Sequence, residues 1–500
     1  MLAQTAFSLS SVDIHAILPE IIITVALMAV LVVDLFLPDR AKSANGIISM
    51  AGVGGAAIAL MSLVNGGTRK TFGGMFVLDN YAMLFKFLFI AVAAILIFMS
   101  VTYLNEVVRN IQGEFYFLLL TSLLGMLVMP SARDLIALFI ALETVTVPGF
   151  IIAGFKKSDN SSNEAAVKFF LFGVLSSAVM LFGMALIYGV TKSTNLYEIA
   201  RVLSSKVYPM PIHHAESIIA AAILLILVGF GFKVSAVPFH FWAPDTYEGS
   251  PVPVAAFLSV ASKAAGFAGL ISIMFVAFGS YTSVWAPGFA VIAALTMTIG
   301  NVIALQQKNI VRLLAYSSIA QAGYMLLPLA VVANKSAAIQ KEAFAAALTY
   351  ILIYSFMQLG AFAVVIAVGR KHPRNLIEDY EGLAFREPGL AFAMLFFLLS
   401  LAGMIPTAGF WAKFFVFRSV IGAGTLWLAA LMVANTLIGL YYYLSVGARM
   451  YLREPRDRAR IAVPYALVMA IILMVVIVAA VTVYPDFFNH FSPRSTLVAF

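Results

Sequence analysis

The chain has 500 residues, of which 62% are hydrophobic and only 11% are charged. Because a soluble domain carries roughly 25% charged residues, this composition is that of a membrane protein. The absence of cysteine excludes disulfide frameworks, thiolate metal sites, iron–sulfur clusters and cysteine nucleophiles. We interpret the net charge of +8 as loop charge that orients the chain in a lipid bilayer, and we expect no nucleic acid partner.

The apolar segments predict the fold class. A helix that crosses a bilayer needs about 20 predominantly apolar residues, and fourteen segments qualify. They lie near 16–37, 44–64, 78–102, 114–131, 133–155, 163–190, 215–238, 251–278, 285–306, 310–333, 341–369, 388–417, 425–448 and 462–484. The first span has no basic segment ahead of it, so we interpret it as retained and not as a cleaved signal. The sequence therefore predicts an all-α polytopic membrane protein.

Basic residues are spread unevenly over the predicted loops. The loops that follow odd-numbered spans carry more lysine and arginine than the loops on the other side. Because positively charged loops tend to stay in the cytoplasm, both termini are expected on the outer side of the membrane. Every arginine lies in a loop or near a span end, whereas the cations inside the spans are lysines.

Five lysines lie inside the apolar runs, and one glutamate lies near the middle of another. They are Lys86, Glu143, Lys168, Lys233, Lys263 and Lys413. An ionisable side chain at the centre of a bilayer costs at least about 2.5–3.5 kcal/mol, and such residues are typical of ion pathways. A desolvated lysine can lose its proton near neutral pH, whereas arginine stays protonated. The preference for lysine therefore favours a proton relay.

Two spans are interrupted beside a lysine. Pro238 follows Lys233 by five residues, and Pro406 precedes Lys413 by seven. Proline removes an amide donor and displaces a carbonyl, and in lipid the freed groups need partners inside the protein or in a watered cavity. Interrupted helices in two halves of a chain are typical of transporter ion sites. The alternative is that each break is a kink that serves helix packing alone.

Glu143 repeats this arrangement, because Pro148 follows it by five residues. A buried carboxylate must be neutral, hydrated or paired with a cation, and we expect Glu143 to pair with Lys233, which lies in the next interrupted span. The alternative is a protonated glutamate that is hydrogen-bonded to a neighbouring helix.

The other three lysines have different neighbours. Lys168 follows Glu164 by four residues, so a local ion pair on one helix face is the alternative to a relay role. Lys263 has serines nearby and no acid close in sequence, which favours a hydrated interior between closely packed helices and a relay role. Lys86 is expected to snorkel to the membrane interface and is left out of the pathway.

Several polar residues are weaker candidates. His240, Asp245 and Glu248 follow Lys233 and either open the pathway to water or are solvated loop residues. Gln321, with the serines before it in the tenth span, is expected to hold water along a proton wire. The Tyr441–Tyr443 run is expected to be an interfacial aromatic element. No Walker loop, dinucleotide fingerprint or nucleophile elbow is present, so no bound nucleotide is expected.

Several segments together resemble the antiporter-like membrane subunits of respiratory complex I. They are EAAVKFF, the stretch from Lys233 to Pro253, GNVIALQQKNIVRLLAYSSIAQAGY, LAGMIPTAGFWAKFF and IGLYYYLSVGARMYL. The opening LPEIIITVALMAVLVVDLFLP and the number of spans resemble one subunit type within that family. The resemblance implies two inverted five-helix repeats with broken seventh and twelfth helices. They would occupy 114–278 and 285–450, after a three-helix segment at 1–113 and before a loop and last helix at 451–500.

The resemblance also implies roles for individual residues. Glu143 and Lys233 would be the glutamate–lysine pair, Lys263 would lie on a central polar axis, and Lys413 would lead to the outer side. Lys168 matches a lysine in the family's sixth span. Gln321 stands where many relatives have histidine, and glutamine cannot accept and release a proton as histidine does.

By the same resemblance, the chain is expected to be a proton-translocating subunit of NADH:quinone oxidoreductase in a bacterial inner membrane. It would hold no cofactor or metal, because NADH, FMN, iron–sulfur clusters and quinone would bind to partner subunits. Its expected partners are the other membrane and peripheral subunits of complex I and the lipid bilayer. The alternatives are a cation/proton antiporter subunit, including one of a membrane-bound hydrogenase, and a non-transporting scaffold.

Overall fold

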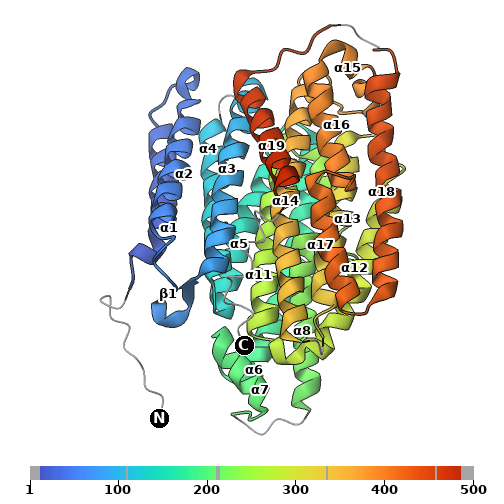
Figure 1. Cartoon of the computed structure of the whole chain (residues 1–500). Helices are drawn as coiled ribbons and strands as arrows, with labels where there is room; N and C mark the ends of the chain where they lie inside the picture. The colour runs from blue at the N-terminus through green and yellow to red at the C-terminus, as the bar shows by residue number, and fades with distance from the viewer. Residues whose placement is uncertain (1–11, 108–110, 210–213, 334–335, 456–458, 486–500) are drawn as a thin grey trace.

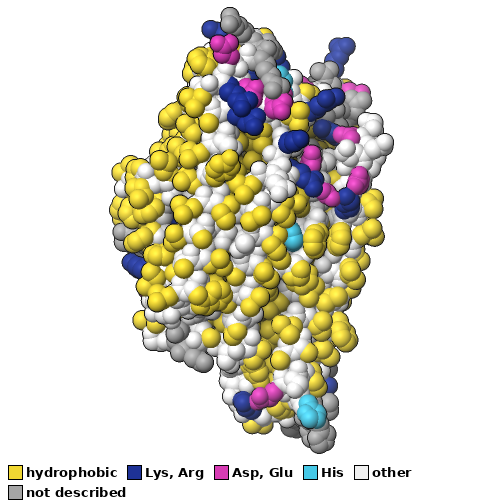
Figure 2. Space-filling model, turned by 90° about the vertical axis from the view of Figure 1, so that its right-hand side faces the viewer, with side chains coloured by type: hydrophobic (Ala, Val, Ile, Leu, Met, Phe, Trp, Pro, Cys, Tyr) yellow, Lys and Arg dark blue, Asp and Glu magenta, His cyan; other side chains and the backbone are white. Residues whose placement is uncertain are grey.

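The computed structural model describes residues 12–107, 111–209, 214–333, 336–455 and 459–485. Figure 1 shows long helices packed side by side, with loops and short helices gathered at the two ends of the bundle. Among the described residues, thirteen helices are long and apolar enough to cross a membrane. Figure 2 shows a broad hydrophobic band around the middle of one face and charged side chains near its ends. The predicted all-α polytopic membrane fold is confirmed.

The N-terminal part holds three long helices and a small hairpin. The helices are α1 (Leu18–Asp34), α2 (Ala44–Ser62) and α3 (Asn80–Val107). The antiparallel strands β1 (Arg69–Thr71) and β2 (Phe76–Leu78) join α2 to α3. This hairpin was not predicted from the sequence, because three-residue strands are too short to show an alternating pattern.

The middle part of the chain holds the next five predicted spans. Its helices are α4 (Gln112–Val128), α5 (Leu135–Ala153), α6 (Asn160–Thr191), α7 (Leu196–Ser205), α8 (Ala215–Val234), α9 (Trp242–Gly249), α10 (Val252–Phe257) and α11 (Lys263–Val276). The amphipathic helix α7 lies in the connection between the predicted spans 163–190 and 215–238. Pro148 lies inside α5 without ending it, so α5 is not broken as α8 is.

The last part of the described chain holds the remaining helices. They are α12 (Thr282–Ala304), α13 (Ile310–Ala330), α14 (Ala337–Gly369), α15 (Leu383–Arg386), α16 (Pro388–Ala402), α17 (Ala408–Gly422), α18 (Leu426–Leu452) and α19 (Tyr465–Val483). Helix α14 contacts α10, α13, α16, α17 and α19, so it forms the centre of this part of the bundle. The predicted twelfth span is divided between α16 and α17, and the predicted fourteenth span corresponds to α19.

Both predicted breaks are confirmed. Helix α8 ends at Val234 because Ser235 adopts the left-handed conformation, with φ of 58°. Helix α16 ends in the same way before Gly403, with φ of 82°. A cis peptide bond follows each ending, at Pro238 and at Pro406. Each break leaves backbone groups without intrahelical partners in the apolar part of the bundle.

A third irregularity lies in the eighth span. A π-helical turn, Leu258–Ser262, separates α10 from α11 and ends directly before Lys263. The carbonyl oxygen of Ser259 in this turn accepts a hydrogen bond of 3.2 Å from the hydroxyl of Tyr354. Such turns insert into helices at many functional sites, and no residue pattern in the sequence had indicated this one.

Gly409 lies where α17 packs against the end of α16. A Cβ atom at this position would lie 1.7 Å from the carbonyl oxygen of Ser400. We expect Gly409→Ala to lower the melting temperature of the assembled protein, because overpacking typically costs about 1–3 kcal/mol. Gly422→Ala in the same helix is the control, because a Cβ atom there meets nothing within 4 Å. Equal melting temperatures of the two variants would contradict this close packing.

Candidate functional site

Three lysines lie in the core of the bundle. Lys233 is 2% exposed, Lys263 is 1% exposed and Lys413 is 7% exposed. Among the described residues, every hydrogen bond found for the three ammonium groups goes to a hydroxyl or a backbone carbonyl, and none of the three forms an ion pair. A buried ammonium with only neutral partners is costly when charged. The three lysines are therefore buried amines without a fixed counter-charge.

Lys233 lies near the end of α8 and donates a hydrogen bond of 2.6 Å to the hydroxyl of Thr146 on α5. Glu143 lies one turn before Thr146 on the same helix, and its carboxylate accepts a hydrogen bond of 2.5 Å from Ser177 on α6. The structure therefore places Thr146 beside Lys233 where we expected Glu143 to be in direct contact. Coupling of the two residues, directly or through water, stays a prediction.

Lys263 begins α11, directly after the π-helical turn. Its ammonium donates hydrogen bonds to the backbone oxygen of Ser318 at 2.8 Å and to its hydroxyl at 2.5 Å. Both acceptors are neutral and belong to α13. The sequence indicated Lys263 but not this partner, because Ser318 lies 55 residues further along the chain.

Lys413 uses a group that the broken helix leaves free. Its ammonium donates a hydrogen bond of 2.8 Å to the carbonyl of Ala402, the last residue of α16. It also lies 4.7 Å from the centre of the Tyr324 ring, a distance at which a cation is attracted by the aromatic face. A Cβ atom at Gly403 would lie 2.8 Å from the Lys413 side chain, so glycine leaves room for the lysine.

Lys233, Lys263 and Lys413 are called the lysine axis below. Polar side chains of α13 and α18 lie beside it. Gln321 is 2% exposed and donates hydrogen bonds to the carbonyl of Leu401 at 3.0 Å and to the hydroxyl of Tyr443 at 3.3 Å. The expectation of an interfacial tyrosine run is wrong for Tyr442 and Tyr443, which are buried, whereas Tyr441 is 69% exposed on the outside of the bundle. Helix α18 directs these two side chains into the bundle, where their hydroxyls form hydrogen bonds with polar residues.

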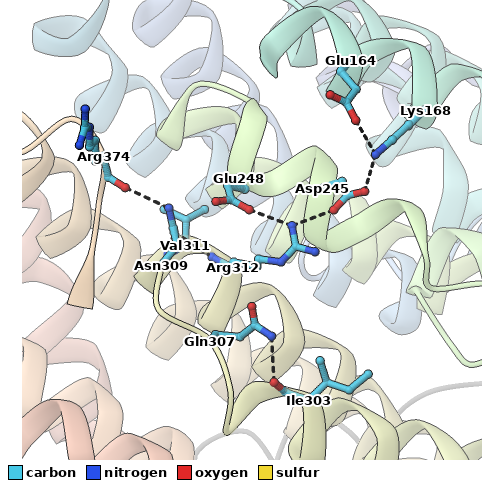
Figure 3. Close-up of polar contacts among 10 residues, drawn as sticks. All are labelled: Glu164, Lys168, Asp245, Glu248, Ile303, Gln307, Asn309, Val311, Arg312 and Arg374. Carbon is cyan, nitrogen blue, oxygen red and sulfur yellow. Dashed lines mark hydrogen bonds and ion pairs between the residues drawn. The ribbon is translucent and has the colours of Figure 1, made fainter. Parts of the chain in front are cut away.

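Lys168 lies in a different setting. Its side chain is 36% exposed, and its ammonium lies 2.6 Å from both Glu164 and Asp245. Arg312 continues the network with contacts of 2.7 Å to Asp245 and 2.8 Å to Glu248 (Figure 3). The local ion pair that we considered as an alternative for Lys168 is therefore present, and it belongs to a chain of five charged groups.

These charged groups line a cavity of about 560 Å³ at one end of the bundle. Burial raises the pKa of the Asp245 carboxyl, but hydrogen bonds from Lys168 and Arg312 outweigh it and hold the pKa below its usual value. Asp245 is therefore an anion at neutral pH. His240 does not belong to this network, since its ring is buried and packs against Phe241 at 4.4 Å between ring centres.

Two buried ion pairs lie outside the lysine axis. Lys86 is fully buried and lies 2.6 Å from Glu20 of α1, so the expectation that Lys86 snorkels is wrong. Arg133, in the α4–α5 connection, is also fully buried and lies 3.0 Å from Asp79. The sequence did hold a signal for the Lys86 pair: Glu20 is an acid in the first predicted span, and Lys86 is a lysine in the third. Within the described residues, no group of three or more metal-binding side chains is found.

A membrane bundle with two broken helices, and with buried lysines held by neutral groups at both breaks, defines a protein of the antiporter-like ion-translocating class. Residues 132–439 match the family model described as NADH:quinone oxidoreductase/Mrp antiporter, transmembrane region. The chain is 40% identical to NADH-quinone oxidoreductase subunit N of Trichlorobacter lovleyi over 466 residues, which cover 92% of this chain and 93% of that protein. This chain therefore belongs to the NADH-quinone oxidoreductase subunit N family.

Solved structures agree with this assignment. The chain is 30% identical to a chain of respiratory complex I from Thermus thermophilus, with a TM-score of 0.75 over 95% of this chain and all of that one. A chain of the Mrp complex from Dietzia has a TM-score of 0.84 over 97% of both chains, but at 20% identity this likeness shows the fold alone. The sequence resemblance to antiporter-like complex I subunits, and to subunit N among them, is confirmed.

Proposed function

We propose that this chain moves protons through Glu143, Lys233, Lys263 and Lys413 as subunit N of a bacterial proton-translocating NADH:quinone oxidoreductase. The observation that carries the proposal is that, among the residues that the structure describes, the three buried lysines have neutral partners only. A lysine with a fixed carboxylate partner keeps its proton, because the ion pair stabilises the charged form. A lysine held by hydroxyl and carbonyl groups changes its charge state more easily when the charge nearby changes.

The lysines respond to one another through their charges. Two unit charges about 10 Å apart interact by roughly 1.7 kcal/mol at an effective dielectric constant of 20. Since about 1.4 kcal/mol corresponds to a tenfold change in a protonation equilibrium, one proton transfer at such a separation would shift the protonation equilibrium of the next site about tenfold. Quinone reduction in partner subunits would start this sequence at Glu143, and Lys413 would release the proton toward the outer side.

The cavity beside Lys168, Asp245 and Arg312 is the proposed opening of the pathway to water. It lies at the end of the bundle that carries the loops after odd-numbered spans, which the charge bias places in the cytoplasm. The ion pairs at this opening keep their charges, so they hold water and attract protons but do not relay them. The termini would then lie on the periplasmic side.

The organisation of the chain follows the same proposal. The two inverted repeats occupy 114–278 and 285–450, so that one broken helix falls in each, and 1–113 and 451–500 flank them. Residues 486–500 lie outside the described part of the chain. NADH, FMN, iron–sulfur clusters and quinone belong to the partner subunits, and this chain contributes electrostatics and proton-binding groups.

Glu143→Gln and Lys233→Met test the proposal in the intact enzyme. Both variants should oxidise NADH with quinone while pumping fewer protons per NADH, because each removes a group that holds or attracts the proton. The measurement is proton uptake per NADH in sealed membrane vesicles. Normal ratios in both variants would reject the proposal. Sodium-dependent transport without NADH oxidation would favour the antiporter alternative, and failed assembly of both variants would favour the scaffold alternative.

A further inference from the structure

One stretch of α13 joins the surroundings of Lys263 to those of Lys413. Ser318 accepts hydrogen bonds from Lys263, and the Tyr324 ring contacts Lys413. These two residues are six positions apart on one helix, which corresponds to about 9 Å along its axis. Buried polar side chains occur along this stretch and on the helices that face it. They are Ser317, Gln321, Tyr350 and Tyr443, each no more than 2% exposed.

The orientation of the Gln321 amide follows from its partners. Its nitrogen donates to the backbone carbonyl of Leu401 at 3.0 Å, and a carbonyl can only accept, so the amide nitrogen must face that side. The amide oxygen then faces the hydroxyl of Tyr350 at 2.5 Å, and that hydroxyl must be the donor. Gln321 therefore occupies a fixed orientation between α14 and α16, and an amide does not exchange its proton at neutral pH as imidazole does.

Tyr443 of α18 has the properties that Gln321 lacks. Its hydroxyl oxygen accepts a hydrogen bond from the amide nitrogen of Gln321 at 3.3 Å. The same hydroxyl forms a hydrogen bond with the hydroxyl of Ser317. A hydroxyl can accept one proton while it releases another, so a chain of hydroxyls carries a proton without any member keeping a charge. Ser317 directly precedes Ser318, the partner of Lys263, on α13. Tyr443 reaches this part of α13 from α18 and also contacts Gln321, which lies three positions before Tyr324.

We propose that Tyr443, oriented by Gln321, relays protons between Lys263 and Lys413 through its contact with Ser317. This inference rests on the proposed proton pathway and assigns its middle step. A proton released by Lys263 passes to the Ser317 hydroxyl as that hydroxyl gives its own proton to Tyr443. Tyr443 gives its proton onward to Lys413, with water completing the path at both ends. Gln321 is a positioning residue, and the relay needs no titrating group at its position.

Tyr443→Phe tests the relay, because it removes the hydroxyl and keeps the ring. The matched control is Tyr441→Phe, two residues away on the same helix and 69% exposed. In vesicles that contain the whole enzyme, Tyr443→Phe should lower the number of protons pumped per NADH to the level of Lys413→Met. Tyr441→Phe should match the unmodified enzyme. Pumping by Tyr443→Phe at the unmodified ratio overturns the inference.

A second variant distinguishes loss of the proton relay from a folding defect. Ser317→Ala removes the other partner of the same hydrogen bond. The double variant of Ser317→Ala and Tyr443→Phe should therefore pump as many protons per NADH as the poorer of the two single variants. Additive losses with reduced amounts of assembled enzyme overturn the relay and favour a packing role. If Lys263→Met and Lys413→Met pump normally, the proposed function itself fails; if they do not pump while Tyr443→Phe does, only the relay fails.

Discussion

Replacing Lys263 with either methionine or arginine should stop proton transfer through this chain and leave the enzyme assembled. Methionine cannot carry the proton, and arginine keeps its charge at all working pH values and so cannot release it. Since a proton-transfer group typically contributes about 10²–10⁴-fold to its step, the flux through the chain should fall by about 100-fold or more. The measurement is proton uptake per NADH in vesicles, together with the amount of assembled enzyme.

The arginine variant carries the decisive information. Lys263 donates to two neutral oxygens of Ser318, and the arginine fork can also donate to such oxygens, so Lys263→Arg keeps the charge in the core. If Lys263→Arg pumps at the unmodified ratio, the site needs a positive charge but does not need to bind and release a proton. Lys157→Met, at an exposed lysine outside the axis, is the control for the loss of one positive charge.

Replacing Lys86 with methionine should give the opposite pattern, with poor assembly and normal pumping by the enzyme that does assemble. Lys86 is fully buried against Glu20 at 2.6 Å. Removing one partner of a buried ion pair typically costs about 3–5 kcal/mol, because the other charge is left without compensation. The measurement is the amount of this subunit in membranes and the melting temperature of the purified enzyme.

The double variant Lys86→Met with Glu20→Gln distinguishes the lost ion pair from lost packing. Glutamine removes the stranded charge, so the double variant should be more stable than Lys86→Met alone. Equal stability of the two would show that packing of the lysine stem accounts for the defect. A loss of pumping without a loss of assembly in Lys86→Met would add this residue to the pathway, from which we exclude it because it is held by a carboxylate.

Lys86 and Lys263 show how far residue type alone predicts a role. Both lysines lie in apolar runs and are almost fully buried, so the sequence marks both as unusual to the same degree. Their partners differ: Lys86 has the carboxylate of Glu20, whereas Lys263 has a serine. In the sequence, only neighbouring residues and family resemblance distinguished the two lysines, and the predicted snorkelling of Lys86 was wrong.

The sequence by itself determined the membrane class, the number and approximate places of the spans, and the two breaks. These features depend on runs of apolar residues and on proline, whose effects act within one helix and can be read from neighbouring positions. It also identified every buried lysine of the proposed axis, because any charge in an apolar run is conspicuous.

Only the tertiary structure decided what each buried group touches. Glu20 lies 66 residues from Lys86, Thr146 lies 87 residues from Lys233, and Tyr443 lies 126 residues from Ser317. No periodicity within a helix specifies such contacts, because they depend on which helix faces meet after packing. The free energy of a buried charge depends on those contacts. The difference between a lysine that stabilises the fold and one that can exchange a proton is therefore set by the packing of helices from distant parts of the chain.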